Sequence, residues 1–289
     1  MTIVRHAYEK SKELGDELDS IAKLVHNCME EFGETPLQAF IETFTGTVQG
    51  MEFIDTVKLL GPRSEVLDIG VGFGQSSMYL ATQGHAVTAI EPSPDYCRLL
   101  EHFSNNFNLA IEIHQCPIEA FVSERKFDAC IFNASFHHCS NPQSVLPQCR
   151  DLLKENGRIF LINENILKFF RTKKWFYRTL EKNPGKIGHY GGNEHVYRHD
   201  EYIKMMKQGG FTDCIEKIPL FYRDIRTVFV LNSNKQENHR YKYGESQLLA
   251  RFLFYYCIWR IVKNPFLTGI AKRLSLILCT FIGTKGARP

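Results

Sequence analysis

The sequence lacks a long apolar run. Its most apolar stretches, residues 252–259 and 274–282, are each shorter than ten residues and are flanked by lysine or arginine. A membrane-spanning helix needs about 20 apolar residues, so neither stretch is predicted to cross a bilayer. The first residues also lack the apolar core of a secretory signal, which favours a cytoplasmic protein.

Paired cysteines are also missing. The nine cysteines are an odd number, they are scattered, and no two are spaced C-x-x-C. A disulfide framework or a structural zinc site would cluster them more tightly. Reduced thiols, mostly buried, are the simpler expectation.

The composition is that of a globular protein, and its charge is uneven. The chain has 289 residues, of which 44% are hydrophobic and 23% charged, so intrinsic disorder is excluded. The net charge of +3 is too small to indicate a nucleic-acid partner. Residues 244–289 hold seven Lys or Arg against one acid, a charge of +6, which leaves −3 for the rest of the chain.

From residue 64 onward, short apolar strands alternate with helices. Near-continuous apolar strands joined by helices predict a parallel sheet covered on both faces, a doubly wound α/β fold. The expected strands are 65–69, 86–90, 110–114, 127–132 and 158–162, with helices at 75–83, 95–107 and 145–153.

The flanks are predicted to be accessory regions. Residues 1–60 form a helical N-terminal extension, and 61–234 form the main domain, with an inserted cap at 163–198. A helix from His199 to about Gly209 precedes strands near 214–218 and 227–231, and a polar linker at 232–238 follows. Residues 235–289 are expected to be a basic, apolar, helical appendage.

A glycine-rich loop follows the first strand. Asp68, Gly70, Gly72 and Gly74 stand where that strand turns into a helix. Glycines let the backbone approach a ligand closely, and the helix N-terminus offers unpaired N–H groups. Glu91 ends the next strand, where its carboxylate can accept hydrogen bonds from both hydroxyls of a ribose.

Two cofactor classes use such a loop. The dinucleotide fingerprint G-x-G-x-x-G/A fails here, because the sixth position is Gln75 counted from Gly70 and Ser77 counted from Gly72. The D-x-G-x-G-x-G form resembles the class I methyltransferases, which are Rossmann-like and depend on S-adenosylmethionine (SAM). The resemblance extends from about Ser64 to Ile162 and includes Glu91 and the turn at 155–157.

That resemblance implies roles for individual residues. Asp68 would contact the methionine end of SAM, Gly70 and Gly72 would line the cofactor, and Gly74 would allow close packing. Glu91, followed by Pro92, would hold the ribose. The family often places an acid against the adenine after the third strand. That acid is absent here, so main-chain groups from Cys116 to Ile118, or the Gln115 amide, are expected to replace it.

The segment after the fourth strand indicates the kind of acceptor. Asn133, on the cofactor side, begins Asn-Ala-Ser-Phe, which has neither proline of the (D/N/S)-P-P-(Y/F) motif found in nucleic-acid amino methyltransferases. The continuation Phe136-His137-His138 resembles small-molecule methyltransferases, which implies a small-molecule or lipid-linked acceptor methylated at oxygen, nitrogen or carbon. An oxidoreductase and a SAM-binding scaffold without turnover are the alternatives.

Four residues are candidates for catalysis. His137 or His138 can act as general base on a hydroxyl acceptor, unless one packs and the other bonds to main chain. His195 and Tyr197, in the capping segment, are expected across the acceptor pocket, although capping of the next helix is the simpler interpretation. No metal is expected, although His189, His195 and His199 offer a less favoured set of ligands.

Cations alternate with aromatic residues in one further segment. Residues 168–178 hold five of each, and no acid occurs before Glu181. A solvated helix face explains this pattern most simply. Together with the basic tail, the segment could instead meet an anionic membrane or a phosphate-bearing substrate, and RNA is a third reading.

Overall fold

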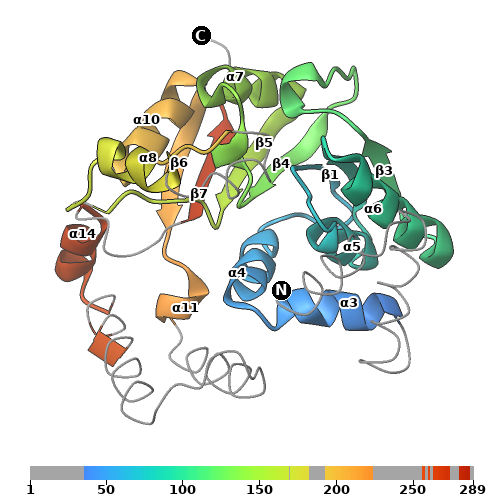
Figure 1. The fold of residues 1–289 in the computed structure, drawn as a ribbon, viewed down its shortest axis with the longest axis horizontal. Helices are drawn as coiled ribbons and strands as arrows, with labels where there is room; N and C mark the ends of the chain where they lie inside the picture. The colour runs from blue at the N-terminus through green and yellow to red at the C-terminus, as the bar shows by residue number, and fades with distance from the viewer. Residues whose placement is uncertain are drawn as a thin grey trace.

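The protein is built around a seven-stranded sheet, seen in a computed structural model (Figure 1). The structure describes residues 36–168, 170–181, 193–223, 256–257, 260, 263–273 and 280–286. The strands are β1 Glu65–Ile69, β2 Ala86–Ile90, β3 Ile111–His114, β4 Phe127–Asn133, β5 Leu153–Ile162, β6 Phe211–Lys217 and β7 Thr280–Lys285.

The strand order reverses at one point of the sheet. The order is β3-β2-β1-β4-β5-β7-β6, and only β7 runs antiparallel to its neighbours. The chain moves outward from β1 to β3 and then returns to place β4 on the other side of β1. Ligands in open α/β sheets bind outside the carboxyl ends of the strands at such a switch point. The predicted doubly wound, mostly parallel sheet is confirmed.

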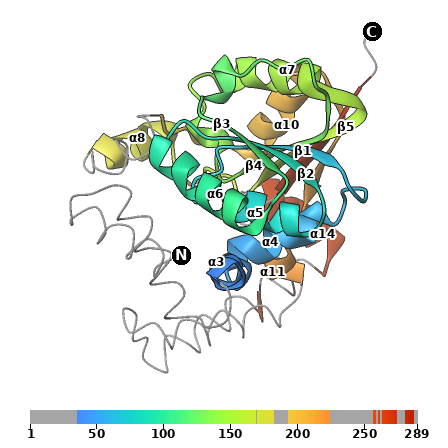
Figure 2. The same ribbon diagram turned by 90° about the vertical axis from the view of Figure 1, so that its right-hand side faces the viewer.

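Helices cover both faces of the sheet (Figure 2). The helices are α3 Pro36–Thr45, α4 Val48–Val57, α5 Gln75–Thr82, α6 Pro94–Phe107, α7 Pro142–Leu152, α8 Lys173–Glu181, α10 His199–Gln208, α11 Leu220–Arg223 and α14 Pro265–Arg273. Two short 3₁₀ turns, η1 Ile118–Ala120 and η2 Phe136–His138, follow β3 and β4.

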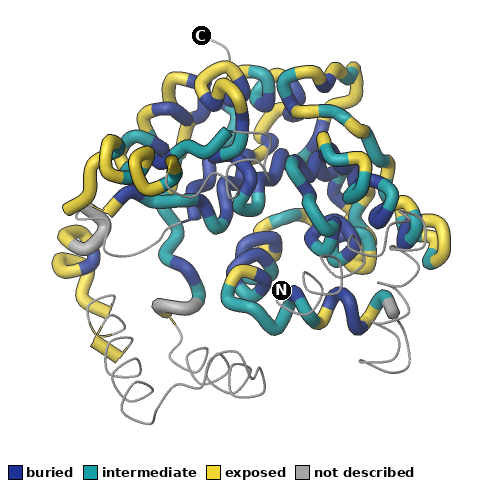
Figure 3. The backbone as a smooth tube through the Cα atoms, viewed as in Figure 1, coloured by how far each residue is buried: buried dark blue, intermediate teal, exposed yellow. Residues whose placement is uncertain are grey.

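Successive residues of each central strand enter different cores, because side chains alternate across a strand. In β1, Val66 packs with Phe53 of α4 on one face, while Leu67 packs with the core of α7 and α10 on the other. Both side chains are fully buried. This double burial explains why the strand is apolar throughout, and Figure 3 shows buried residues running through the middle of the sheet.

The C-terminal prediction is partly wrong. Residues 265–273 are helical, as expected, but 280–285 form β7, which lies between β5 and β6. The basic, apolar segment is therefore an insertion between β6 and β7 and not an appendage after the sheet. The predicted strand at 227–231 and the linker at 232–238 lie outside the described residues, as does most of the N-terminal extension before Pro36.

Other boundaries differ by a few residues. Strand β6 begins at Phe211 and not near Cys214. Strand β5 begins at Leu153, so the expected turn at 155–157 is an irregularity within it. Asn156 there has a φ of 62°, the left-handed conformation that Asn before Gly adopts readily.

Buried Glu52 connects α4 to the far end of the sheet. It is 2% exposed. Its carboxylate accepts hydrogen bonds from Lys217 Nζ at 2.8 Å, Thr280 Oγ1 at 2.7 Å and the Leu220 amide at 2.7 Å. A buried carboxylate is tolerated only when it is paired in this way. Helix α4 is thus fastened to both β6 and β7.

Among the described residues, no helix combines the length and apolar character needed to span a membrane.

Candidate active site

The glycine loop after β1 has the form of a ligand-binding turn. Gly72 has a φ of +53°, and a Cβ built there would meet nothing within 4 Å. A side chain at this position would be strained and would fill the space that the loop leaves open. A Cβ on Gly74 would approach Leu100 Cδ1 to 2.7 Å, so Gly74 allows α5 and α6 to pack closely.

Asp68 lies buried beneath this loop with one oxygen unused. Its Oδ2 accepts hydrogen bonds from the hydroxyls of Ser77 at 2.6 Å and Ser76 at 2.8 Å. Its Oδ1 is buried and has no partner among the described residues. Burial raises the pKa of Asp68 to about 6, although the two hydroxyls oppose the shift. A buried, unsatisfied carboxylate oxygen fits a cationic ligand group such as the ammonium of SAM.

Glu91 lies against the same loop. Its Oε2 accepts from the Gly72 amide at 2.8 Å and its Oε1 from the Ser93 amide at 2.9 Å. Burial raises the pKa of Glu91, while these two backbone bonds lower it and the Asp68 charge raises it further. The carboxylate is therefore held at the end of β2, next to the glycine loop.

The remaining cofactor candidates follow the neighbouring strands. Pro92 is exposed, whereas the Ile118 side chain is 4% exposed and packs in the core. Ile118 O already accepts from Gln148 Nε2 at 2.7 Å. Cys116 is half-buried, and its amide donates to His114 O at 3.0 Å. Asn133 Oδ1 accepts from Asn163 Nδ2 at 2.7 Å and so joins the ends of β4 and β5.

The histidine turn η2 abuts the glycine loop. Ser135 Oγ donates to Ile69 O at 2.5 Å, and a Cβ on Gly70 would come within 2.7 Å of Ser135 Cβ. The two loops that follow β1 and β4 are therefore in contact at the switch point. This contact places the histidines next to the proposed cofactor loop.

A buried glutamate that the sequence analysis missed organises this turn. Glu164, two residues beyond β5, is 3% exposed. Its carboxylate accepts from the amides of Ser135, Phe136 and His137 at 3.1–3.2 Å and from His137 Nδ1 at 2.6 Å. Burial alone would lower the pKa of His137, but the Glu164 carboxylate raises it overall. Glu164 could have been identified from its position in the sequence, because it closely follows the carboxyl end of a predicted strand.

The capping segment brings further polar groups to the same place. The His195 amide donates to His137 O at 2.9 Å. His138 Nδ1 donates to Asn193 O at 3.0 Å and lies 3.1 Å from Glu194 Oε2. The structure therefore brings together His137, His138 and His195, and adds Glu194.

Tyr197 has a different environment. Its ring packs against Tyr202 at 5.4 Å and lies under Lys173 Nζ at 4.8 Å. Burial raises the pKa of Tyr197 to about 12, which makes the phenol a poor base near neutral pH. His199 is 4% exposed at the start of α10, while His189 lies outside the described residues.

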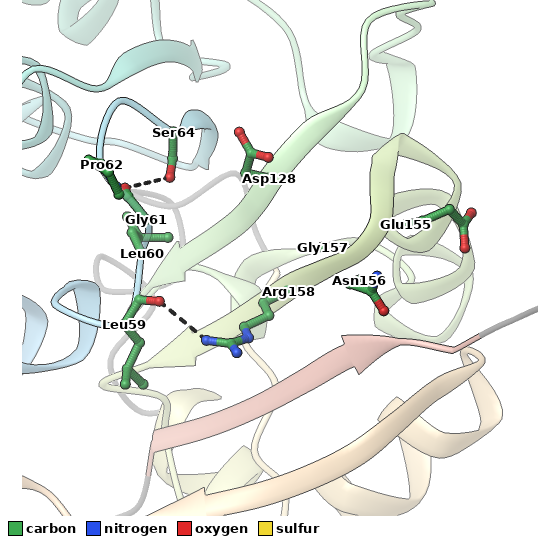
Figure 4. Close-up of a pocket in the computed structure, with 10 residues that line it drawn as sticks. All are labelled: Leu59, Leu60, Gly61, Pro62, Ser64, Asp128, Glu155, Asn156, Gly157 and Arg158. Atoms are coloured by element: carbon green, nitrogen blue, oxygen red, sulfur yellow. Dashed lines mark hydrogen bonds between the residues drawn. The ribbon is translucent and has the colours of Figure 1, made fainter.

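A separate pocket lies at the opposite end of the strands (Figure 4). It is lined by residues before β1, such as Ser64, and by the start of β5. Arg158 Nη1 donates to Leu59 O at 3.2 Å across its wall, and Ser64 Oγ donates to Gly61 O at 2.8 Å. Because ligands of such sheets bind at the carboxyl ends, this pocket is not the candidate site.

Comparisons with known proteins agree with this geometry. Residues 67–161 match a family model described as a methyltransferase domain. The ubiquinone biosynthesis O-methyltransferase of Pasteurella multocida (strain Pm70) is 26% identical over 191 residues, 61% of this chain and 76% of that protein. Its namesake from Xylella fastidiosa (strain 9a5c) is 32% identical over 117 residues, 39% of this chain and 47% of that protein. The chain thus spans less than two thirds of some relatives.

Solved structures share the fold. A phosphoethanolamine N-methyltransferase 2 of Haemonchus contortus, in complex with phosphomonomethylethanolamine and S-adenosylhomocysteine, superposes with a TM-score of 0.55 at 13% identity, over 87% of this chain and 60% of that one. A putative sarcosine dimethylglycine methyltransferase of Galdieria sulphuraria gives 0.53 at 14% identity, over 84% and 85%.

Residues 67–161 are therefore a methyltransferase domain, and the fold around them is that of the class I SAM-dependent methyltransferases. The cofactor of this domain is SAM, and the oxidoreductase alternative is not favoured.

Replacing Glu91 with alanine is expected to weaken SAM binding about tenfold or more. The change removes a charged acceptor, and each such hydrogen bond contributes roughly 1.5–3 kcal/mol. Calorimetric titration with SAM measures the effect, and Glu112→Gln on neighbouring β3, at an exposed carboxylate, is the control. Normal SAM affinity in both Glu91→Ala and Gly72→Val would remove these residues from the cofactor site.

Proposed function

We propose that the chain transfers the methyl group of SAM to a hydroxyl oxygen of a small-molecule or lipid-linked acceptor held beside His137 and His138. The contact between the glycine loop and the histidine turn carries this proposal, because it puts the histidines next to the cofactor loop. Oxygen is preferred over nitrogen or carbon because the curated relatives are named O-methyltransferases.

The chemistry requires alignment and removal of one proton. A new bond forms between the acceptor oxygen and the methyl carbon as the bond from that carbon to sulfur breaks, and the hydroxyl proton leaves. SAM supplies an activated methyl group when bound, so alignment and exclusion of water do much of the work. The side chains proposed to face the acceptor are His137, His138 and His195, whereas Tyr197 is proposed to support His195, 6.1 Å away between ring centres.

Replacing His138 with asparagine tests the acceptor side. Turnover is expected to fall by about 10²-fold or more, the size of a lost proton-transfer contribution. SAM affinity is expected to stay the same, because His138 is proposed to meet the acceptor and not the cofactor. The measurement is product formation from a panel of hydroxyl acceptors, with calorimetry for SAM. Equal turnover in wild type, His138→Asn and His195→Asn would contradict this placement of the acceptor.

A second proposal concerns the insertion between β6 and β7. Helix α14 exposes Phe266 by 74%, Leu267 by 41% and Ile270 by 40%, and residues 244–289 carry a charge of +6. Apolar side chains among cations suit the surface of an anionic membrane, where each nearby Lys or Arg adds about 1 kcal/mol. A lipid-linked acceptor would be reached from such a surface.

Vesicle co-sedimentation tests this contact. The full chain is expected to pellet with vesicles rich in phosphatidylserine at low salt and to be released as salt screens the charges. Phe266→Ser should reduce pelleting, whereas Val122→Ser, at a valine 91% exposed near η1, should not. If anionic vesicles leave the chain in the supernatant, α14 has another role.

A further inference from the structure

Three potential metal ligands converge in the acceptor site. One ligand atom each from His137, His138 and Glu194 lie within 4.8 Å of one another. The first two belong to η2, and Glu194 lies in the segment that leads to α10. The hydrogen bond from the His195 amide to His137 O, at 2.9 Å, joins the two segments. A main-chain hydrogen bond therefore holds the two segments that carry these three side chains next to each other.

Both imidazoles are oriented from behind by oxygen acceptors. His137 Nδ1 donates to Glu164 Oε2 at 2.6 Å, and His138 Nδ1 donates to Asn193 O at 3.0 Å. A neutral imidazole that donates through Nδ1 keeps its lone pair on Nε2. Metal-binding histidines almost always donate their other nitrogen to a carboxylate or a backbone carbonyl in this way.

Glu194 is also oriented. Asn165 Nδ2 donates to its Oε1 at 2.8 Å, while its Oε2 lies 3.1 Å from His138 Nδ1. Bonds of about 2.0–2.1 Å at tetrahedral angles put two ligand atoms of one zinc ion about 3.4 Å apart. The ligand atoms here, which lie within 4.8 Å of one another, would have to approach by up to about 1.4 Å to share an ion.

The charge of the site favours a cation. Glu164 and Glu194 have exposed side-chain fractions of 0% and 15%, and within the described parts of the chain neither forms an ion pair with a lysine or arginine. Their only cationic neighbours are the histidines, and only when these are protonated. A bound dication would balance this negative charge.

We propose that His137, His138 and Glu194 bind a divalent transition-metal ion, Zn²⁺ or a similar ion. Two imidazoles and one carboxylate suit such ions, whereas Mg²⁺ and Ca²⁺ prefer oxygen ligands alone. Three protein ligands leave one position for an acceptor oxygen, a role that rests on the proposed function. His195, the next residue, has a buried Nε2 without a partner in the described structure, so a further donor lies in the same segment.

Metal binding is tested on the full chain without substrate. Protein dialysed against chelator is titrated with Zn²⁺ by calorimetry and with Co²⁺ by visible absorption, and its metal content is measured. About one equivalent is expected, with Co²⁺ bands typical of nitrogen and oxygen ligands. His138→Asn and Glu194→Gln should each weaken binding at least tenfold, whereas His102→Asn and Glu155→Gln, outside the site, should not. Glu164→Gln should cost roughly 10–100-fold, as loss of an orienting carboxylate does.

The outcomes separate this proposal from the proposed function. Absence of Zn²⁺ and Co²⁺ binding, or equal loss in the site variants and the two controls, would overturn the metal site. Hydroxyl methylation that continues in chelated protein would leave the proposed function standing without a metal. One equivalent of metal with no methylation of any hydroxyl acceptor would support the site and contradict the function. Binding of an ammonium-bearing acceptor in place of a metal would also overturn the proposal. Circular dichroism and SAM affinity show whether each variant is folded.

Discussion

Asp68→Asn is expected to make the cofactor-free fold more stable at pH 8 while it weakens SAM binding. Asp68 is 1% exposed, and burial raises its pKa to about 6 from the ordinary value of 3.8. Because the folded pKa is the higher one, the stabilising contribution of Asp68 is fully present below pH 3.8 and is lost as pH rises through 6. Two pKa units correspond to about 3 kcal/mol of stability.

The negative charge of Glu91 also favours the neutral asparagine over the Asp68 carboxylate. The Glu91 carboxylate, at the end of β2, repels it, so removal of the Asp68 charge also relieves Glu91. The asparagine oxygen can still accept from Ser76 and Ser77. The free energy of unfolding of the variant, relative to wild type, is therefore expected to rise by about 3 kcal/mol between pH 4 and pH 8.

Urea unfolding across that pH range measures the effect. Asp128→Asn is the matched control, because its carboxylate, 40% exposed, lies near the other end of the sheet. It should show no comparable rise. A difference between Asp68→Asn and wild type that stays constant with pH would contradict the assigned cause. The loss of SAM affinity tests the separate proposal that Asp68 Oδ1 meets the cofactor.

The second large effect is expected at Glu164. The Glu164 carboxylate accepts four hydrogen bonds. In Glu164→Gln, one neutral oxygen remains as acceptor, and the new amide NH₂ group faces N–H donors with which it cannot form hydrogen bonds. Breaking a buried ion pair in this way costs about 3–5 kcal/mol. The melting temperature is then expected to fall by about 10 °C.

Calorimetry with a matched variant checks this effect. Glu119→Gln alters an exposed carboxylate that accepts from the Ser140 amide, at 2.7 Å, just after the same turn. It is expected to change stability by less than about 1 kcal/mol, as exposed sites usually do. A similar small change for both variants would show that Glu164 does not hold the histidine turn.

The central strands and the glycine loop were predictable because their signals are local. Each strand is buried on both faces, so an apolar run ending in a turn is visible within a few residues. The positions of Asp68 and Glu91 near the ligand site were predictable in the same way, because each residue lies at the carboxyl end of a strand. The contact between Gly70 and Ser135 is different, because 65 residues separate them and only the sheet order brings them together.

The features that the sequence did not predict, β7 and the role of Glu164, also depend on contacts between distant parts of the chain. Strand β7 pairs with β5 and β6 across long sequence separations, and its six residues, although rich in strand-forming Thr, Phe and Ile, do not identify those partners. Glu164 was overlooked because its partners lie 27–29 residues earlier in the chain. Sequence periodicity reports the burial of a segment but not the identity of its neighbours.

The position of β7 also has a consequence for protein synthesis. Strand β6 is the edge of the sheet, and its described neighbour, β7, follows it in the chain only after residues 218–279. At about 5–20 residues per second, a ribosome needs roughly 3–12 s to make that insertion. During this interval β6 lacks β7, the strand it pairs with in the described structure, and an unpaired edge invites aggregation. The nascent chain is therefore most in need of a chaperone after the cofactor half of the sheet has emerged.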